Sequence, residues 1–227
     1  MTDGLGPSTG LAVLHLFCSP GPHTDASAVV TAVKSCVADD HQVVTVTLFG
    51  HKADLAVMAL GPDARRLRQL QTELVAAGLV LRDSYVSMTE ISEYAEGLPD
   101  ELKQARLFPL LPPEGKRAWC FYPMSKRRNV GQNWYLLPYD ERDKLMRGHG
   151  KTGRTFAGRV LQLITGSTGV DDHEWGVTLF AVHLDDLKDV VYTMRFDDAS
   201  AIYAEFGPFY TGVVAPIDEV LADLGLS

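Results

Sequence analysis

Apolar residues in the first half of the chain follow two spacings, one typical of strands and one typical of helices. Short apolar runs predict strands at residues 11–18, 42–49, 54–60 and 80–91. Between them, apolar residues at helical spacing predict helices at 25–37 and 62–77. The Asp25 side chain can cap the first helix, and Pro62 suits the start of the second. The predicted order is strand, helix, strand, strand, helix, strand.

The second half repeats that order. Strands are predicted at 117–124, 160–165, 175–182 and 209–214, with helices at 138–156 and 184–195 and a shorter helix at 197–205. A proline-rich segment, residues 97–113, connects the halves. Two βαββαβ units in tandem predict an α+β fold of two ferredoxin-like modules packed sheet to sheet, one over residues 1–105 and one over 106–227.

Length and composition fit a soluble globular protein. The chain has 227 residues, of which 46% are hydrophobic and 22% are charged. The net charge of −8 argues against nucleic acid and acidic lipid as partners, although it leaves a small anionic ligand open. No apolar run approaches the roughly 20 residues that span a membrane, no signal peptide is visible, and the cysteines form no CxxC motif. We expect a cytoplasmic protein with reduced thiols and no membrane span.

An apolar strand in the second half runs directly into three basic residues, in the segment WCFYPMSKRR at 119–128. Because strand side chains alternate, Tyr122, Met124 and Lys126 share one face of this strand. A phenol, a thioether and an ammonium on one face suit a large planar ligand with anionic edges. The alternative is an amphipathic strand with a solvated basic end.

His149 lies in a helical pattern between Gly148 and Gly150. Each glycine in a helix interior lowers helix stability by about 1 kcal/mol relative to alanine. The presence of two glycines beside His149 therefore needs an explanation. Small neighbours let a flat group approach the backbone closely, as haem does when a histidine binds its iron. Leu145 and Phe156 lie on about the same helix face and could wall a pocket. The alternative is a helix that breaks at Gly148 and leaves a surface histidine.

Three further polar positions are candidates for ligand contact. Gln162 interrupts an apolar strand and, by alternation, shares a face with Ile164, so its amide faces either water or a ligand. Arg106 and Arg195 can bind carboxylates through their planar guanidinium groups. The alternative for each arginine is a surface ion pair, which is the commoner case.

Taken in order, these segments resemble one family. FYPMSKRR, NWYLLP, HGKTGR, the strand around Gln162, ITGSTGVDDHEWGVTLFA and YTMRFDDASAIYAEFGPF are similar to segments of the coprohaem decarboxylases of the chlorite dismutase superfamily, most of all to the type found in Gram-positive bacteria. The resemblance is close from about residue 106 to residue 212. It implies that the two modules form a dimeric α+β barrel with the haem site in the C-terminal module, and that the chain assembles as a ring of five.

The resemblance also implies roles for individual residues. His149 would be the proximal ligand of the iron, Tyr122 the catalytic tyrosine, and Lys126 the residue that holds a propionate and assists proton movement. Gln162 would lie on the distal side of the iron, where chlorite dismutases proper carry an arginine, which argues against chlorite breakdown. The residues expected to contact the porphyrin and its propionates are Arg106, Tyr122, Pro123, Met124, Ser125, Lys126, Gln162, Arg195 and Ser200.

The implied reaction converts iron coproporphyrin III to haem b by two oxidative decarboxylations with hydrogen peroxide, the last step of coproporphyrin-dependent haem synthesis. Tyr122 would lose an electron and a proton and then abstract hydrogen from a propionate. The implied partners are further copies of the chain in a homopentamer and, transiently, a coproporphyrin ferrochelatase. Trp134 and Trp175 are oxidisable, but we expect both to be core aromatics. A non-catalytic haem carrier, a chlorite- or peroxide-consuming haem enzyme and a cofactor-free barrel remain alternatives.

Overall fold

The N-terminal half has the predicted order of elements. The computed structural model describes residues 5–95 and 97–226, and each of the six predicted elements of this half ends within two residues of its expected bounds. Asp25 caps its helix by accepting a hydrogen bond from the backbone N–H of Ala28 at 3.0 Å. Asp63 does the same for the second helix, which therefore begins at Ala64 rather than at Pro62. The elements are β1 (Ala12–Pro20), α1 (Ala26–Ala38), β2 (Gln42–Leu48), β3 (Leu55–Gly61), α2 (Ala64–Ala76) and β4 (Leu79–Thr89).

The C-terminal half contains the predicted unit with additions. Its main elements are β5 (Ala118–Lys126), α4 (Tyr139–Arg154), β8 (Val160–Gly166), β9 (Trp175–Ala181), α5 (Leu184–Met194) and β11 (Tyr210–Val214). A hairpin and a 3-10 turn lie between β5 and α4, and a terminal helix follows β11. These smaller elements, which the hydrophobic pattern did not predict, are β6 (Arg128–Asn129), β7 (Gln132–Asn133), η2 (Trp134–Leu136) and α7 (Ile217–Asp223).

Two expectations about elements were wrong. The connector between the halves is not only a link, because it contains the helix α3 (Asp100–Leu107), which spans the expected module boundary at 105/106. The 3-10 turn η1 (Glu93–Ala95) comes just before the connector. The helix expected at 197–205 ends as α6 (Asp198–Ala201), and β10 (Ala204–Phe206) follows it. The register of β10 explains the change, since Ala204 pairs with Lys126 and Phe206 with Met124 at the end of β5.

The strands of both halves form one sheet that closes on itself. The order is β10-β5-β11-β2-β3-β1-β4-β8-β9, and β9 pairs again with β5. Each half has the strand order of a ferredoxin-like βαββαβ module, β2-β3-β1-β4 in one and β11-β5-β9-β8 in the other. The antiparallel pairs β4–β8 and β11–β2 join the two modules. The predicted α+β barrel is therefore confirmed.

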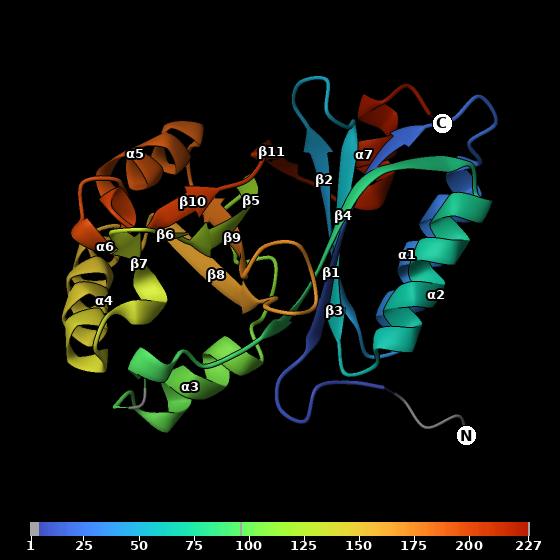
Figure 1. Cartoon of the computed structure of the whole chain (residues 1–227). Coiled ribbons are helices and arrows are strands. Elements are labelled where there is room, and N and C mark those ends of the chain that lie inside the picture. Colours follow the sequence, from blue (N-terminus) through green and yellow to red (C-terminus); the bar gives the residue numbers. More distant parts are fainter. Residues whose placement is uncertain (1–4, 96, 227) are drawn as a thin grey trace.

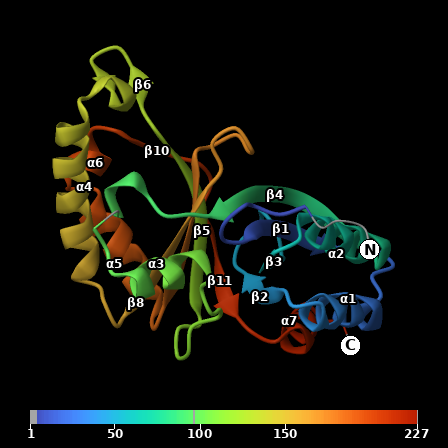
Figure 2. The same ribbon diagram turned by 90° about the horizontal axis from the view of Figure 1, so that it is seen from below.

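Helices cover the outside of this barrel on two sides, as Figures 1 and 2 show. Helices α1, α2 and α7 pack on the outer face of the N-terminal strands, and α4 and α5 lie beside the C-terminal strands. The space between the two sheets is filled by apolar residues such as Phe17, Met58, Trp119 and Phe121. A filled interior leaves the outer face of the C-terminal sheet, beneath α4 and α5, as the place for a ligand site. No described helix combines the length and the apolarity that a membrane crossing needs.

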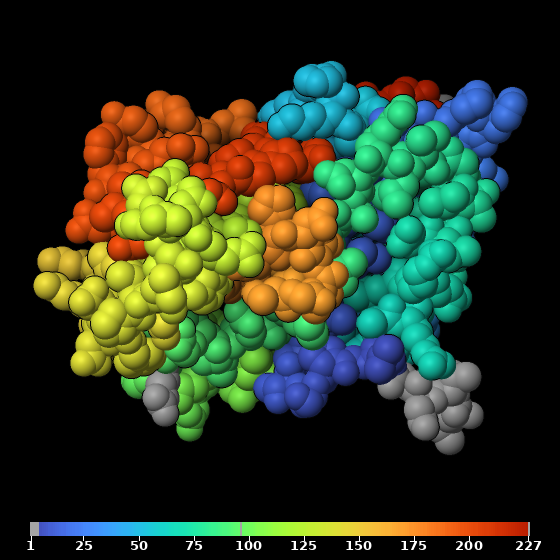
Figure 3. All heavy atoms as spheres, viewed as in Figure 1, coloured from blue at the N-terminus to red at the C-terminus, as the bar shows by residue number. Residues whose placement is uncertain are grey.

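Buried polar contacts join the two modules inside the barrel. His15 of β1 is fully buried, and its Nε2 lies 3.1 Å from Oγ1 of Thr178 in β9. Burial lowers the pKa of His15 to about 3, so the imidazole is neutral in the folded protein. Tyr85 of β4 makes a hydrogen bond with Ser167, at the start of the loop after β8. That loop lies on the face of the molecule viewed in Figure 3, between the atoms of α4 and those of β4.

Candidate functional site

Tyr122 lies on the outer face of β5, where alternation predicted it. Its side chain is 8% exposed and packs in the outer C-terminal layer with Met124 against it. The ring of Phe209 stacks on the phenol at 4.4 Å between centroids, and Phe206 meets it edge-on at 5.6 Å. Burial raises the pKa of Tyr122, and the charge of Arg195 opposes that rise. The hydroxyl forms no hydrogen bond within the described residues, so it is available to a ligand.

Lys126 lies two residues beyond Met124 and is 7% exposed. Its Nζ donates a hydrogen bond to the carbonyl of Ala199 at 2.8 Å and lies 4.3 Å from the centre of the Trp134 ring. Burial lowers the pKa of Lys126 to about 8, while Asp197 and Glu174 act in the opposite direction. An ammonium has three donors, and the one used in the described part of the chain reaches a carbonyl rather than a carboxylate. A buried cation in this state suits an anionic ligand.

Two of the expected contacts on this strand point elsewhere. Ser125 accepts a hydrogen bond from the backbone N–H of Glu174 at 3.3 Å through its side-chain oxygen. Pro123 is buried, and its carbonyl accepts a hydrogen bond from Gly207 at 2.8 Å. Since strand side chains alternate, both side chains lie on the face opposite Tyr122. The expected contact of a ligand with Pro123 and Ser125 stays a prediction.

His149 lies on the inner side of α4, with a side chain 30% exposed. Its Nδ1 is 3.1 and 3.2 Å from the two carboxylate oxygens of Asp197 and 3.5 Å from the hydroxyl of Ser200. These contacts fix the ring and leave Nε2 as the nitrogen that can bind a metal. Burial alone would raise the pKa of Asp197, but the hydrogen bond and charge of His149 and the hydrogen bonds of Ser200 hold it below its usual range.

The short helix α6 connects this histidine to β5. Asp197 caps α6 by accepting a hydrogen bond from the backbone N–H of Ser200 at 3.1 Å. The carbonyl of Ala199 in the same turn binds Lys126, as described above. The sequence analysis did not name Asp197 as a site residue. An Asp three residues before a Ser at a helix start is a capping pattern, and it could have drawn attention to Asp197. The structure thus brings together His149, Ser200 and Lys126, three of the predicted site residues.

Gln162 lies on β8, on the face that alternation predicted. Its neighbour Leu163 packs inside the barrel, whereas Ile164 is 42% exposed on the outer side. The register places Gln162 opposite Leu179 of β9 and Leu179 opposite Cys120 of β5. Two strand spacings, about 10 Å, therefore separate Gln162 from β5 on one sheet face.

The alternative of a helix that breaks at Gly148 was wrong. Helix α4 continues through Gly148 and Gly150 to Arg154, so the helix does not break at Gly148. A Cβ at Gly148 would meet nothing within 4 Å, and one at Gly150 would meet only the side chain of Arg154. Close approach occurs instead at Gly153, one turn after His149, where a Cβ would lie 3.5 Å from the amide nitrogen of Gln162. Gly153 therefore lies against Gln162 of β8.

The two candidate arginines differ in position. The guanidinium of Arg195 lies 4.9 Å from the centre of the Phe206 ring, and Phe206 also contacts Tyr122. Arg106 is exposed in the last turn of α3 and makes no hydrogen bond or ion pair with another described residue. The structure places Arg195 at the site but does not bring Arg106 to it.

The two tryptophans also differ. Trp134 is 3% exposed, as expected of a core aromatic. Trp175 is half-buried, and its indole N–H donates a hydrogen bond to Glu90 at 3.1 Å.

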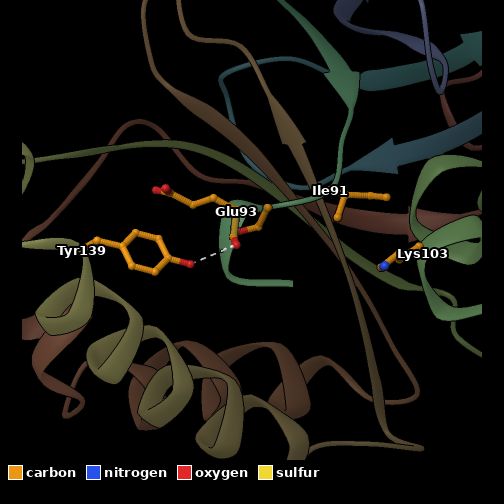
Figure 4. Close-up of a pocket in the computed structure, with 5 residues that line it drawn as sticks. Ile91, Glu93, Lys103 and Tyr139 are labelled. Atoms are coloured by element: carbon orange, nitrogen blue, oxygen red, sulfur yellow. Dashed lines mark hydrogen bonds between the residues drawn. The ribbon is translucent and has the colours of Figure 1, made fainter. Parts of the chain in front are cut away.

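A cavity of about 480 Å³ lies at the start of α4 (Figure 4). Tyr139 borders it and donates a hydrogen bond to the carbonyl of Glu93 at 3.4 Å. None of the residues expected from the sequence lines this cavity, and His149 lies ten residues further along α4, or about 15 Å along the helix axis. The lining residues are Ile91, Ser92, Glu93, Lys103 and Tyr139.

The donor set favours a prosthetic group over a protein-held metal ion. Among the described residues, no group of three or more His, Cys, Asp or Glu side chains could hold a metal ion. A metal at His149 Nε2 would therefore take its other ligands from a bound group. The Lys126 ammonium forms no ion pair within the described residues, and the hydroxyl of Tyr122 forms no hydrogen bond there. Both groups suit a ligand with carboxylate edges, so these residues fit an iron porphyrin that carries propionates.

The comparison with known families agrees with this chemistry. The family model described as chlorite dismutase matches residues 24–215 of the chain. The chain belongs to the chlorite dismutase family. A structure described as a novel heme-binding protein from Thermus thermophilus is similar to it, with 34% identity, a TM-score of 0.85, and coverage of 99% of this chain and 100% of that one.

Two further solved structures share the fold. One is a mutant chlorite dismutase from Candidatus Nitrospira defluvii, with 18% identity, a TM-score of 0.76, and coverage of 96% of this chain and 97% of the other. The second is chlorite dismutase from Candidatus Nitrospira defluvii in complex with imidazole, with 17% identity, a TM-score of 0.75 and 96% coverage of both chains. At these identities the likeness shows the fold alone.

Proposed function

We propose that this protein is a coprohaem decarboxylase. It binds iron coproporphyrin III as its substrate and uses hydrogen peroxide to convert two propionates to vinyl groups, so that haem b is the product and haem synthesis the physiological role. The observation that carries the proposal is the buried Lys126 ammonium, which forms no ion pair within the described residues and donates its hydrogen bond to a carbonyl. It lies on the same strand face as the hydroxyl of Tyr122, which forms no hydrogen bond within those residues.

Each decarboxylation balances with one peroxide. A propionate side chain loses one hydrogen from its β-carbon and its carboxylate as CO2, and the remaining two carbons become a vinyl group. Two electrons leave the side chain, and peroxide takes them up with protons to give two water molecules. When bound, the iron porphyrin would supply the site at which peroxide is activated, and His149 would hold its iron through Nε2.

Tyr122 is the residue best placed to oxidise the propionate. Its raised pKa keeps the phenol protonated near neutral pH, so it must release a proton when it loses an electron. The resulting phenoxyl can take the hydrogen atom from the β-carbon. Lys126 orients the carboxylate beside it by a charge-assisted hydrogen bond, and this positioning selects which carbon reacts. Arg195, beside Phe206, and Ser200, beside His149, would share the binding of propionates.

Asp197 sets the orientation and basicity of His149. A carboxylate on Nδ1 fixes the imidazole tautomer and makes the ring a stronger electron donor. Gln162, on the same sheet face, can donate a hydrogen bond from its amide but has no basic group. It also lacks the permanent positive charge of an arginine, and a chlorite anion would gain less from it. This difference favours peroxide over chlorite as the oxidant.

The partners of the proposed enzyme follow from the same assignment. The chain would assemble as a homopentamer and receive its substrate from a coproporphyrin ferrochelatase through a transient contact. Neither step requires a membrane span.

Non-catalytic haem binding is the second candidate function, and the description of the Thermus thermophilus relative as a heme-binding protein favours it. Purified protein loaded with iron coproporphyrin III separates the candidates. A decarboxylase forms haem b when peroxide is added stepwise, as extraction and chromatography of the porphyrin would show. A carrier gives a Soret band with the substrate but returns it unchanged. Oxygen release on chlorite addition would favour a chlorite dismutase instead.

A further inference from the structure

Three aromatic rings lead from Lys126 to the protein surface at the start of α4. Trp134 lies under the Lys126 ammonium, 4.3 Å from its Nζ. The centroid of the Tyr94 ring is 6.4 Å from that of Trp134, and the Tyr139 ring stacks on Tyr94 at 5.9 Å. We call Trp134, Tyr94 and Tyr139 the aromatic chain. It begins with a side chain 3% exposed and ends with one 46% exposed.

The aromatic chain ends at a solvent-accessible position. Tyr139 borders the cavity of about 480 Å³ at the start of α4, and Figure 4 shows its ring directed toward Glu93. The rings span η2, the segment around η1 and the first turn of α4, so three separate elements converge to place them in sequence. Tyr203 also contacts Trp134, at 5.3 Å between centroids, but has no further aromatic partner among the described residues. Tyr203 is half-buried, so this branch ends after one ring.

The surroundings of Tyr94 suit a group that loses an electron and a proton together. Its hydroxyl accepts a hydrogen bond from Nε of Arg142 at 3.0 Å, and Arg142 pairs with the carboxylate of Glu93 at 3.5 Å. Burial raises the pKa of Tyr94 to about 12, and a hydrogen bond to Glu93 acts in the same direction. The phenol is therefore protonated at rest, and the Glu93 carboxylate beside it can take the proton on oxidation and return it on reduction.

We propose that the aromatic chain carries oxidising equivalents from the porphyrin site to Tyr139, where a small one-electron donor of the phenol or enediol class restores the protein. The proposal rests on the proposed function, which supplies the bound iron porphyrin and the peroxide. Each peroxide takes up two electrons and two protons and becomes two water molecules. Tyr139 gives up one electron and one proton per transfer and regains both from the donor, so two donor molecules are oxidised per peroxide.

Lys126 makes this route secondary to propionate oxidation. A cation over the face of an indole stabilises the neutral ring, so removal of an electron from Trp134 becomes harder. Tyr122 lies on the substrate face and has no cation over its ring among the described residues. The aromatic chain therefore carries oxidising equivalents mainly when no propionate consumes them. This is the case when haem b rather than the substrate is bound.

Radical trapping tests the proposal. Protein loaded with haem b receives one equivalent of peroxide in the presence of a nitroso spin trap, and peptide mass spectrometry then locates the trapped residues. Tyr192 is the matched control, because it is 63% exposed and its only ring partner among the described residues is Phe196. We expect several-fold more adduct on Tyr139 than on Tyr192 in the wild type. The excess should disappear in Trp134→Phe, and also in Tyr94→Phe if the first variant fails to bind haem.

Equal labelling of Tyr139 and Tyr192 in the wild type would overturn the proposal, because it would show oxidation from solvent. Unchanged Tyr139 labelling in both variants would overturn it as well. Extraction of the porphyrin from a parallel reaction with iron coproporphyrin III separates this result from the proposed function. If haem b forms and the two tyrosines are labelled equally, the decarboxylase proposal holds and electron transfer through the aromatic chain is contradicted. If labelling depends on Trp134 but no haem b forms, electron transfer holds and decarboxylation is contradicted.

Discussion

His15 should make the barrel sensitive to acid. The imidazole is fully buried between the two modules, and folding lowers its pKa from 6.5 to about 3. Below pH 6.5 the unfolded chain binds a proton at His15 that the folded chain does not bind until about pH 3. Stability therefore falls as the pH falls through this window and is fully present above it. The cost is about 2 kcal/mol at pH 5 and about 4 kcal/mol at pH 3.

The variant His15→Gln isolates this effect. A glutamine amide can still reach Thr178 Oγ1 but does not titrate, so the variant should lose about 2 kcal/mol less than the wild type between pH 7.5 and pH 5. Urea unfolding followed by tryptophan fluorescence at several pH values measures the difference. Thr178→Val is the matched control, because it removes the hydrogen bond and keeps the imidazole, and it should lower stability at every pH without changing the pH slope.

Parallel stability–pH curves for the wild type and His15→Gln would refute this reasoning. They would mean that His15 takes up a proton in the folded barrel as readily as in the unfolded chain. Solvent would then have to reach the interior between the two sheets.

The remaining predictions concern the site. Because the pKa of Lys126 is about 8, the affinity for iron coproporphyrin III should fall as the pH rises through that value. In a spectroscopic titration, Lys126→Arg should keep its affinity to higher pH. The same pH profile in both proteins would contradict the role of the ammonium. Asp197→Asn should weaken iron ligation by His149 by about 10–100-fold and shift the Soret band, and an unchanged band would remove Asp197 from its role. Gly148→Ala should stabilise the exposed helix by up to about 1 kcal/mol in urea unfolding without changing porphyrin affinity, whereas a large affinity loss would return Gly148 to the binding face.

The periodic parts of the fold could be predicted from the sequence. Two hydrophobic spacings sufficed for the ferredoxin-like modules, because each element buries one continuous apolar face. The shorter elements depend on partners far away in the chain. Ala204–Phe206 became β10 rather than helix because the end of β5 offered unpaired backbone groups, and no local pattern at 204–206 encodes that edge.

The site shows the same division. Alternation along one strand was enough to place Tyr122, Met124 and Lys126 on a common face. The contacts of His149 depend on the start of α6, and Asp197 is 48 residues away in sequence. A capping pattern can mark Asp197 as a helix start, but only the folded chain shows that its carboxylate meets His149. The glycines beside His149 could not show whether the helix continues, and the structure shows that it does. Helical geometry puts the residue four positions later, Gly153, on the face of His149.

The most direct test of the central claim is a mass spectrum of the porphyrin after stepwise peroxide addition, for the wild type and for Tyr122→Phe. The account predicts two successive losses of CO2 with two hydrogens in the wild type, ending at haem b. Tyr122→Phe should bind the same substrate with a Soret band but return it with all its propionates. Haem b formed by Tyr122→Phe at the wild-type rate would contradict the role of the tyrosine, and an unchanged porphyrin in the wild type would contradict decarboxylation itself.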